Sequence, residues 1–529
     1  MNQHALDMTT VPAEFPRTVL LGPYYILSWL YMPMMTYMRE RWGTRFVILI
    51  PPNTDLEEQY RPYCGPEGIF IHVPGFEETA NDKNIKQEDI AGIFEEARAN
   101  EEHYSVHYTI DIYQQERSVA SGFVSGTSKS PFISRNPLSF VGLARASNFY
   151  FRFYEELFAR FNFDAALIFP RTAAEAVCAT VATKHGVPVT YPCAARHKNL
   201  VYWAFGTYCD KSQHRMAYEA MGEGATLPDV ELVPAGAPVS LDRRTVVQRH
   251  SWKGALKQTF ALLKDHVAFL LLDLRKTQVR FDRWINSIRT LRTIWREQAH
   301  FQKFVRLCEC DFGKITARPF VFFAFHMEPE FATQARCKEF NDQGAIVRQL
   351  ALSLPAGMNL IIKEHAWFAG HRVSFYSDLV ALPNVIMAHP GIQAVDLIPK
   401  AAAVVTLGGT VALEAALFGK PALIFADRSE VSLLPNVTVI RSLGDMPRIL
   451  QKLKPLSVEE AANSNRAAKR LLSVIEAIGV EASPFFTKEK KLLDHTNVER
   501  ATHLLLDVLR LIRSPKPEAS RAERVVSTL

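Results

Sequence analysis

The C-terminal half of the chain alternates short apolar runs with stretches of helical periodicity, and this rhythm constrains the fold more than any other feature. The apolar runs occupy residues 320–325, 360–362, 385–388, 404–407 and 422–426. Helical patterns lie between several of these runs, at 344–354, 374–382 and 411–418. Strands that alternate with helices are typical of a parallel, doubly wound sheet.

The N-terminal half shows a looser version of the same pattern. Its apolar runs occupy residues 18–21, 45–50, 69–73, 165–169 and 187–191, with helical patterns at 149–161 and 173–184. We therefore expect an α/β protein with two Rossmann-like, doubly wound domains that face a cleft, and ligands at the carboxyl ends of the strands. The expected segments are an N-terminal domain, a basic helical arm, a C-terminal domain, and C-terminal helices with a frayed tail, at 1–240, 241–316, 317–450 and 451–529.

Several classes of protein are disfavoured by what the 529 residues lack. The first residues, MNQHALDMTTVPAEF, have neither the basic segment nor the apolar run of a secretory signal, and no uncharged apolar run reaches the length of a membrane span. The seven cysteines are scattered, without zinc spacing or a disulfide framework. The sequence contains no P-loop and no G-x-G-x-x-G, which disfavours an ATPase or a dehydrogenase. We expect a cytoplasmic protein that needs no metal and no cofactor.

The net charge of +6 is concentrated in one segment. Residues 252–306 hold twelve Lys or Arg and four Asp or Glu, a net +8, and arginines alternate there with aromatic residues in long helical patterns. Two interpretations stay open: a solvated helical arm packed on its own protein, which we favour, and peripheral contact with the anionic inner face of a membrane. No nucleic-acid reader motif accompanies the segment, so nucleic acid is not an expected partner.

The stretch VVTLGGTVALEAALFGKPALIFAD, at 404–427, predicts a strand, a tight turn, a buried helix and a second strand. We expect Gly408 and Gly409 to allow close approach to the main chain, and Thr410 to cap the helix. Glu414 lies one turn inside that helix. An anion-binding helix N-terminus and an ordinary capped crossover helix both fit these residues.

The other strands of the C-terminal half also end in polar residues. "HMEPE" (326–330) follows the first, "KEHAWFAGHR" (363–372) the second, and His389-Pro390 the third. Lys363 and Arg372 could neutralise phosphate oxygens, with His365 as a further donor. A carboxylate such as Glu414 could accept hydrogen bonds from ribose. The sequence therefore predicts a nucleotide pocket at this edge of the sheet.

These stretches resemble the capsule and surface polysaccharide biosynthesis family, which is related to bacterial Kdo transferases and has the two-domain glycosyltransferase-B architecture. The resemblance covers residues 320–427 through FVFFAFHMEPE, NDQGAIVRQLALSLPAGMNLIIKEHAWFAGHR, LPNV and VVTLGGTVALEAALFGKPALIF. Over the first 240 residues it rests only on FPRTAAEAV and PCAARHKNLVYWAF. It departs from the family at Ala366, because related sequences read Lys-Glu-His-Pro, and this difference bears on the pose of the donor.

The resemblance implies a sugar transferase whose C-terminal domain holds a nucleotide-activated donor. It implies catalytic roles for His326 and His365. It implies contacts with the donor or its nucleotide for Glu330, Lys363, Glu364, Arg372, Gly408, Gly409, Thr410 and Glu414. In the N-terminal domain, which would carry the acceptor, Glu175 is a candidate base and Arg196 a candidate partner for an acidic sugar. A helix-dipole acid paired with Arg171 is the favoured alternative for Glu175.

We therefore expect a metal-independent glycosyltransferase of surface-polysaccharide synthesis, with a glycan or glycolipid acceptor and a donor that the resemblance suggests to be a CMP-activated acidic sugar. Two alternatives stay open. A nucleotide-sugar 2-epimerase can use the same two-sheet architecture, and would act on the donor without an acceptor. A non-catalytic nucleotide-sugar-binding subunit of a polysaccharide assembly complex would bind the nucleotide without turnover.

Overall fold

The computed structural model describes residues 15–22, 27–52, 54–81, 85–116, 138–195, 197–222, 252–275, 281–328, 330–365, 368–482 and 492–513. The chain forms two compact units. Unit 1 comprises 1–112, 138–221 and 474–529, and unit 2 comprises 113–137 and 222–473. This division differs from the four expected segments, because the end of the chain returns to the first unit and the basic arm belongs to the second.

Unit 2 is built on a seven-stranded sheet in the order β13-β12-β11-β8-β9-β10-β7, and every strand pairing within it is parallel. The strands are β7 (Cys308–Glu309), β8 (Phe320–Ala324), β9 (Asn359–Lys363), β10 (Val385–Ala388), β11 (Ala403–Thr406), β12 (Ala422–Ile424) and β13 (Val437–Val439). The continuous apolar runs are explained by burial, since β8, β9 and β11 lie in the middle of the sheet with both faces covered.

The chain reverses its direction across this sheet between β8 and β11. The order runs outward from β8 through β9 to β10, and β11 then returns to the other side of β8, with Val404 opposite Phe322. In open α/β sheets, ligands bind outside the carboxyl ends of the strands at such a reversal. The segments that follow β8 and β11 are therefore the first place to look for a site in unit 2.

Unit 1 contains a second seven-stranded sheet, in the order β14-β6-β5-β4-β1-β2-β3. Its strands are β1 (Thr18–Leu21), β2 (Arg45–Ile50), β3 (Ile69–His72), β4 (Ala165–Leu167), β5 (Val189–Ala194), β6 (Leu200–Phe205) and β14 (Val480–Glu481). β1 to β5 pair in parallel, whereas β6 and β14 add an antiparallel edge. The reversal in this sheet lies between β1 and β4.

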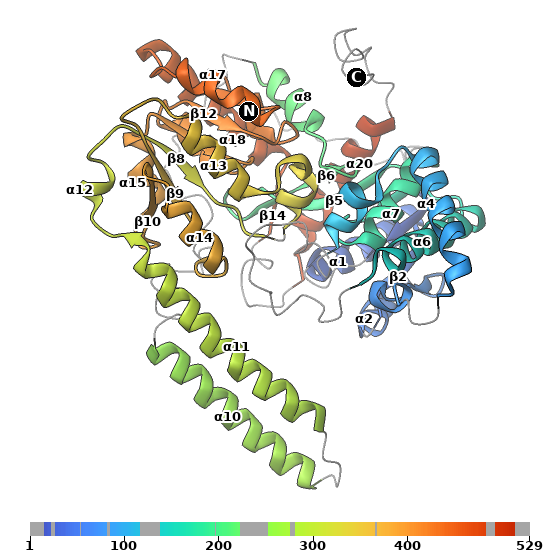
Figure 1. Ribbon diagram of the computed structural model, residues 1–529. Coiled ribbons are helices and arrows are strands. Elements are labelled where there is room, and N and C mark those ends of the chain that lie inside the picture. The colour runs from blue at the N-terminus through green and yellow to red at the C-terminus, as the bar shows by residue number, and fades with distance from the viewer. Residues whose placement is uncertain are drawn as a thin grey trace. The chain divides into compact units, whose positions relative to one another are not determined.

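Helices connect the strands in both units (Figure 1). Those of unit 1 are α1 (Ser28–Trp42), α2 (Leu56–Cys64), α3 (Phe76–Thr79), α4 (Ile90–Tyr104), α6 (Phe140–Arg160), α7 (Ala173–Lys184), α8 (Ser212–Ala220) and α20 (His495–Arg513). Those of unit 2 are α10 (Trp252–Arg275), α11 (Phe281–Arg306), α12 (Phe312–Ile315), α13 (Gln343–Ser353), α14 (Val373–Val380), α15 (Ala394–Leu397), α16 (Val411–Leu417) and α17 (Met446–Gln451). α18 (Val458–Ile478) links the two units along the chain.

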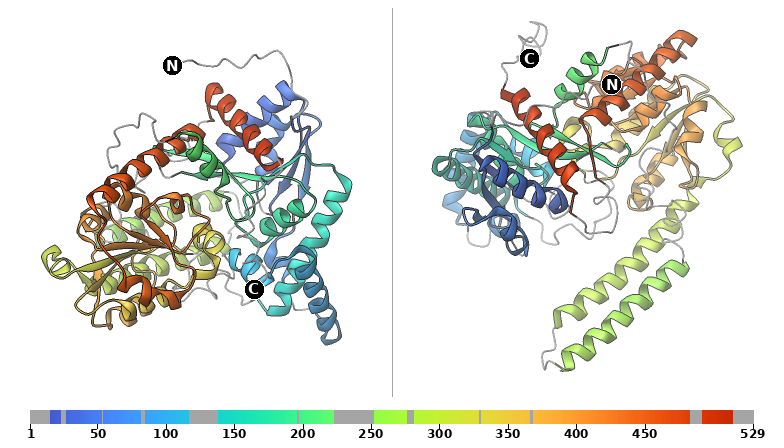
Figure 2. Two further views of the ribbon diagram at one scale, coloured as in Figure 1. Left: turned by 90° about the horizontal axis from the view of Figure 1, so that it is seen from above. Right: turned by 180° about the vertical axis from the view of Figure 1, so that it is seen from behind.

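Helix α20 shows why the C-terminal segment belongs to unit 1. It packs beside α1, although the two helices are separated by more than four hundred residues (Figure 2). Its apolar face, including Leu505 and Leu509, joins the same core as Met34 and Met38. The indole of Trp203 on β6 donates to the carbonyl of Ala501 over 2.8 Å. Helix α20 thus completes the hydrophobic core of unit 1.

The expected fold class is confirmed, since both sheets are doubly wound and every expected strand is present. The bounds differ by a few residues at most. The short edge strands β7, β13 and β14 were not expected, because a run of two or three residues carries little periodicity. The antiparallel strand β6 was not expected either, although it is a six-residue apolar run. Within the described residues, none of the helices combines the length and the apolar character that a membrane span requires.

Candidate functional site

A histidine and a threonine meet at the reversal point of the unit 2 sheet. His326 follows β8, and its Nε2 lies 2.8 Å from Oγ1 of Thr406, the last residue of β11. Thr406 is fully buried and His326 is half-buried. The hydrogen bond therefore ties the imidazole to the neighbouring strand at the carboxyl edge of the sheet.

The glycine turn after β11 makes room for this imidazole. A Cβ on Gly409 would lie 2.8 Å from Cε1 and 3.0 Å from Nε2 of His326, closer than side chains pack. A Cβ on Gly408 would lie 2.7 Å from that of Ala426. Neither glycine has a positive φ, so close approach is what requires glycine here. The expected cap is not formed, because Thr410 has helical angles and its side chain makes no capping hydrogen bond.

Gln343 holds the main chain of His326 from the other side. Its side-chain Oε1 accepts from the His326 N–H over 2.8 Å, and its Nε2 donates to the His326 carbonyl over 3.1 Å. Gln343 opens α13, where the Asp342 carboxylate caps the helix by accepting from Gly344 N and Ala345 N over 3.0 Å. A capped helix thus presents an amide that pairs with both polar groups of one peptide residue.

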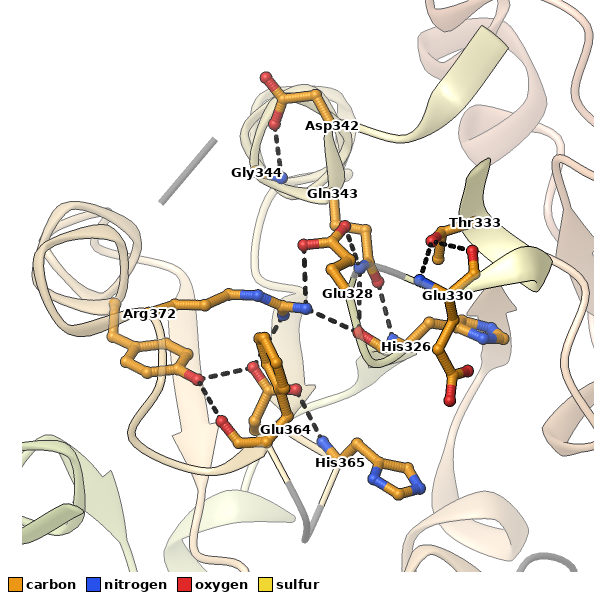
Figure 3. Close-up of polar contacts among 12 residues, drawn as sticks. His326, Glu328, Glu330, Thr333, Asp342, Gln343, Gly344, Glu364, His365 and Arg372 are labelled. Carbon is orange, nitrogen blue, oxygen red and sulfur yellow. Dashed lines mark hydrogen bonds and ion pairs between the residues drawn. The ribbon is translucent and has the colours of Figure 1, made fainter. Parts of the chain in front are cut away.

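A buried arginine joins the loops that follow β8 and β9 (Figure 3). Nη1 of Arg372 donates to Oε2 of Glu364 over 2.8 Å, and Nη2 lies 3.0 Å from Oε2 of Glu328 and donates to the His326 carbonyl over 2.6 Å. The hydroxyl of Tyr376 donates to the same Glu364 oxygen over 2.7 Å. The guanidinium also lies over the rings of Phe325 and Phe368.

Burial governs the protonation of the two acids in this cluster. Burial raises the pKa of Glu328 to about 7, opposed by Arg372 and by the hydrogen bond from Gln343. Burial also raises the pKa of Glu364, again opposed by Arg372. One guanidinium between two carboxylates leaves a surplus negative charge when both acids are ionised, which disfavours the second ionisation. The cluster is most nearly neutral when one acid holds a proton.

The placement of Arg372 and Glu364 differs from the expected contacts with the donor or its nucleotide. Both side chains are fully buried, and each is held by an ion pair inside the protein. A guanidinium removed from solvent and flanked by two carboxylates is a poor site for a further anion, because the local charge is already compensated. We assign both residues to positioning the histidine loops rather than to touching the ligand.

Three further candidates lie on the same loops. Lys363 ends β9, is only 8% exposed and donates to the Pro390 carbonyl over 3.3 Å. His365 is half-buried, and its imidazole points away from the Arg372 cluster (Figure 3). Glu330 is half-buried and opens the helical turn η5 (Ala332–Arg336), where its carbonyl accepts from Thr333 N and Gln334 N. The structure thus brings Lys363 and His365 to the edge that His326 occupies.

Glu414 is buried within α16, a helix of only seven residues. Its side chain is only 4% exposed, whereas contact with ribose was expected. That contact stays a prediction.

In unit 1, Glu175 lies in the first turn of α7, which Thr172 caps. Thr172 Oγ1 accepts from the Glu175 N–H over 3.3 Å, and the Glu175 carboxylate accepts from the Arg171 N–H and pairs with Nε of Arg171 at 3.5 Å. These are the contacts of the favoured alternative, a helix-dipole acid beside an arginine. The segment lies at the reversal between β1 and β4, so a second role as a base stays a prediction. Arg196 lies outside the described residues.

Sequence reasoning missed Glu328, Gln343, Thr406 and Tyr376. Thr406 could have been found, since it is the polar residue within the apolar run 404–407. Glu328 and Gln343 carried no such signal, because their roles depend on contacts across loops. Within the described part of the chain, no group of three or more His, Cys, Asp or Glu side chains is arranged to hold a metal ion.

No protein-family model and no curated protein matches the chain. Similar solved structures include KpsC of Thermosulfurimonas dismutans, a beta Kdo 2,7 transferase, with 14% identity and a TM-score of 0.21; the match covers 32% of this chain and 52% of that one, about half of its length. UDP-GlcNAc 2-epimerase from Neisseria meningitidis bound to UDP-GlcNAc has 10% identity and a TM-score of 0.28, covering 93% and 99%. An Arabidopsis thaliana protein complexed with UDP-L-rhamnose has 10% identity and a TM-score of 0.28, covering 94% and 100%. TM-scores of this size carry no argument, and the fold class rests on the strand order and pairing.

Proposed function

We propose that the protein is a glycosyltransferase of bacterial capsule or surface polysaccharide biosynthesis, which transfers a sugar from a nucleotide-activated donor to a glycan or glycolipid acceptor. The observation that carries the proposal is the position of His326. Its imidazole is hydrogen-bonded to Thr406 and lies close to Gly409, at the reversal point of the unit 2 sheet. Lys363 and His365 lie on the neighbouring strand end. The resemblance of these segments to the surface-polysaccharide family supplies the reaction class, and a CMP-activated acidic sugar is the donor that it suggests.

In this reaction an acceptor hydroxyl oxygen forms a bond to the anomeric carbon, and the bond from that carbon to the donor phosphate oxygen breaks. The bonding pair stays on the phosphate, and the acceptor proton passes to a base. Negative charge therefore grows on the departing phosphate, where hydrogen-bond donors held in fixed positions stabilise the transition state most. We assign this role to His326 and His365, with Lys363 as a fixed positive charge and Glu175 as a candidate base.

The Arg372 cluster has a supporting role in this proposal. Through the His326 carbonyl and the Glu364 carboxylate it joins the two loops that carry the histidines. Rigid loops keep catalytic groups within the narrow range of positions that catalysis requires.

We place the reaction in the cytoplasm, at the inner face of the membrane. All seven cysteines are free thiols, which suits a reducing compartment.

The proposal is tested in two steps. Thermal unfolding of the full chain is followed with CMP, UDP, GDP, CDP and dTDP, because a ligand that binds the folded protein raises its melting temperature. Activated sugars of the stabilising nucleotide are then incubated with the protein, with and without a panel of glycan acceptors. Nucleotide release that depends on an acceptor supports the transferase.

The other outcomes identify the alternatives. Conversion of the donor without an acceptor indicates a 2-epimerase. Nucleotide binding without turnover on any donor indicates a binding subunit. A chain that no nucleotide stabilises contradicts all three functions.

A further inference from the structure

Helix α10 carries an exposed apolar stripe. Trp252, Leu256, Phe260 and Leu263 are 53%, 46%, 68% and 46% exposed, although they are large apolar side chains. Their spacing of four, four and three residues places them within an arc of about 80° at 100° per residue, so they form one face of the helix. Scattered apolar residues on a surface are ordinary, whereas a contiguous stripe marks an interaction surface.

Basic residues border this stripe on α10. Lys253, Lys257 and Lys264 are exposed, and the same helical geometry places them within about 60° of the stripe's edge. On the side of the stripe away from these lysines, α10 packs against α11, with Ala255 buried. Three faces therefore follow one another around the axis of α10: the face that packs on α11, the apolar stripe, and an edge of lysines.

Helix α11 contributes a second basic edge. Arg292, Arg296, Lys303 and Arg306 are all exposed, and their spacing puts them on one face. The ring centroids of Trp252 on α10 and Trp295 on α11 lie 5.7 Å apart. The apolar stripe therefore continues from α10 onto α11, toward the basic residues of α11. The resulting surface, which we call the arm face, is an apolar strip with positive charge along both sides.

The base of the arm is built into unit 2. Phe301 and Phe304 of α11 are buried in its core, and the Phe304 ring lies 4.6 Å from that of Tyr376, whose hydroxyl bonds to Glu364. Gly370, in the loop that carries His365 and Arg372, approaches the main chain of Phe301 so closely that a Cβ would lie 2.8 Å from its Cα. A helix about 39 Å long is thus anchored at the loop after β9 (Figure 1).

We propose that the arm face docks on an anionic lipid surface. A helix whose apolar face is bordered by Lys and Arg lies in the plane of a membrane interface. Its apolar side chains enter the headgroup region, and its Lys and Arg side chains contact lipid phosphates. A second copy of this chain fits less well, because pairing two arm faces would bring the seven basic side chains of each copy together. This docking is independent of the reaction proposed above, and its test does not use activity.

The test is cosedimentation of the full chain with vesicles. One set contains phosphatidylcholine alone, and the other contains phosphatidylcholine with about one-third phosphatidylglycerol. We expect binding to the anionic vesicles at low salt, and release at about 1 M salt, where the screening length falls to about 3 Å.

Two variants separate the two parts of the arm face. Leu256→Ser with Phe260→Ser keeps the charge and should weaken binding by about tenfold or more through lost apolar burial. Arg292→Glu with Arg296→Glu keeps the apolar stripe and should weaken it by at least about fivefold for each charge. Because the substituted residues are exposed, we expect both variants to fold like the wild type. Circular dichroism spectra and melting temperatures check this.

Matched controls lie elsewhere in unit 2. Leu352→Ser removes an apolar side chain that is 76% exposed on α13, and Lys452→Glu with Lys454→Glu makes the same change in net charge as the arginine variant. Both controls should bind vesicles like the wild type.

The following results overturn the proposal: no binding to anionic vesicles, equal binding to neutral ones, or arm variants that bind like the wild type. A dimer in analytical ultracentrifugation that both arm variants dissociate, without vesicle binding, would identify a second copy as the occupant instead.

Discussion

The guanidinium of Arg372 donates from Nη1 to Oε2 of Glu364 over 2.8 Å, and neither side chain is exposed to solvent. The two residues stand at the ends of the loop that contains His365, so their ion pair closes that loop. Through Nη2 the same guanidinium holds the carbonyl of His326. Glu364, in the middle of the Lys-Glu-His segment, thus holds the loops in place, whereas Lys363 and His365 stay candidates for ligand binding.

The first prediction concerns the stability of this cluster. Arg372→Met should destabilise unit 2 by about 3–5 kcal/mol, because it leaves Glu328 and Glu364 buried without their cation. Combining it with Glu328→Gln and Glu364→Gln should recover most of that loss, since no buried charge remains. The free energy of unfolding in urea measures both the loss in the single variant and the recovery in the triple variant.

The control for this prediction is Arg441→Met, which breaks an exposed ion pair with Asp427 and should cost about 1 kcal/mol or less. Equal effects of the two arginine variants would show that the buried cluster has no special role.

The second prediction concerns pH. The pKa of Glu328 is raised to about 7, chiefly by burial, so the folded protein binds this proton more tightly than the unfolded chain. The stabilisation is fully present below the unfolded pKa of about 4.3 and is lost as the pH rises through 7, a change of up to about 4 kcal/mol. Glu328→Gln should flatten the pH dependence of urea unfolding between about pH 5 and 8.

Glu459→Gln, on the exposed first turn of α18, is the control for the pH series and should leave the slope unchanged. If Glu328→Gln also leaves it unchanged, the pH dependence of stability has another source.

The third prediction concerns the contact between Gly409 and His326. Gly409→Ala should cost about 1–3 kcal/mol, because its Cβ would overlap the imidazole. In the double variant with His326→Ala this cost should shrink, since the ring that causes the overlap is gone. A double-mutant cycle from unfolding curves measures the coupling.

Gly92→Ala on α4, where a Cβ meets nothing within 4 Å, should be neutral or stabilising. Strictly additive effects of Gly409→Ala and His326→Ala would mean that the turn relaxes away from the ring.

The fourth prediction separates catalysis from binding. His365→Ala should lower kcat by about a hundredfold while donor affinity changes little, because a donor aimed at the departing phosphate acts mainly in the transition state. His326→Ala should behave similarly if it touches the reacting sugar. The exposed His103→Ala in unit 1 is the control. Equal proportional losses of affinity and kcat would assign the histidines to binding alone.

The fifth prediction concerns metals. In the proposed reaction Lys363 supplies a positive charge and the two histidines supply hydrogen-bond donors at the phosphate, so turnover should survive EDTA. A strict requirement for added magnesium or manganese would contradict this assignment of charge.

The alternation of apolar runs and helical patterns was sufficient to predict both doubly wound sheets, because strands buried on both faces must be apolar throughout and each crossover needs a helix. It also placed polar residues at the carboxyl ends of β8, β9 and β11. The basic charge of 252–306 was equally plain, although its apolar stripe was not singled out from the other aromatic residues.

Only the tertiary structure decided what each polar residue does. Lys363, Glu364 and Arg372 look alike as candidates in a sequence, and all three are buried, yet Glu364 and Arg372 form an ion pair with each other whereas Lys363 donates to the Pro390 carbonyl. Gly409 was expected to allow close approach to the main chain, but only the structure shows that the approaching group is the ring of His326, eighty-three residues earlier. Periodicity reports which face of an element is buried, because burial acts on every residue of that face. Ion pairs and close contacts between loops depend on how distant segments meet in space, and local sequence does not encode those distances.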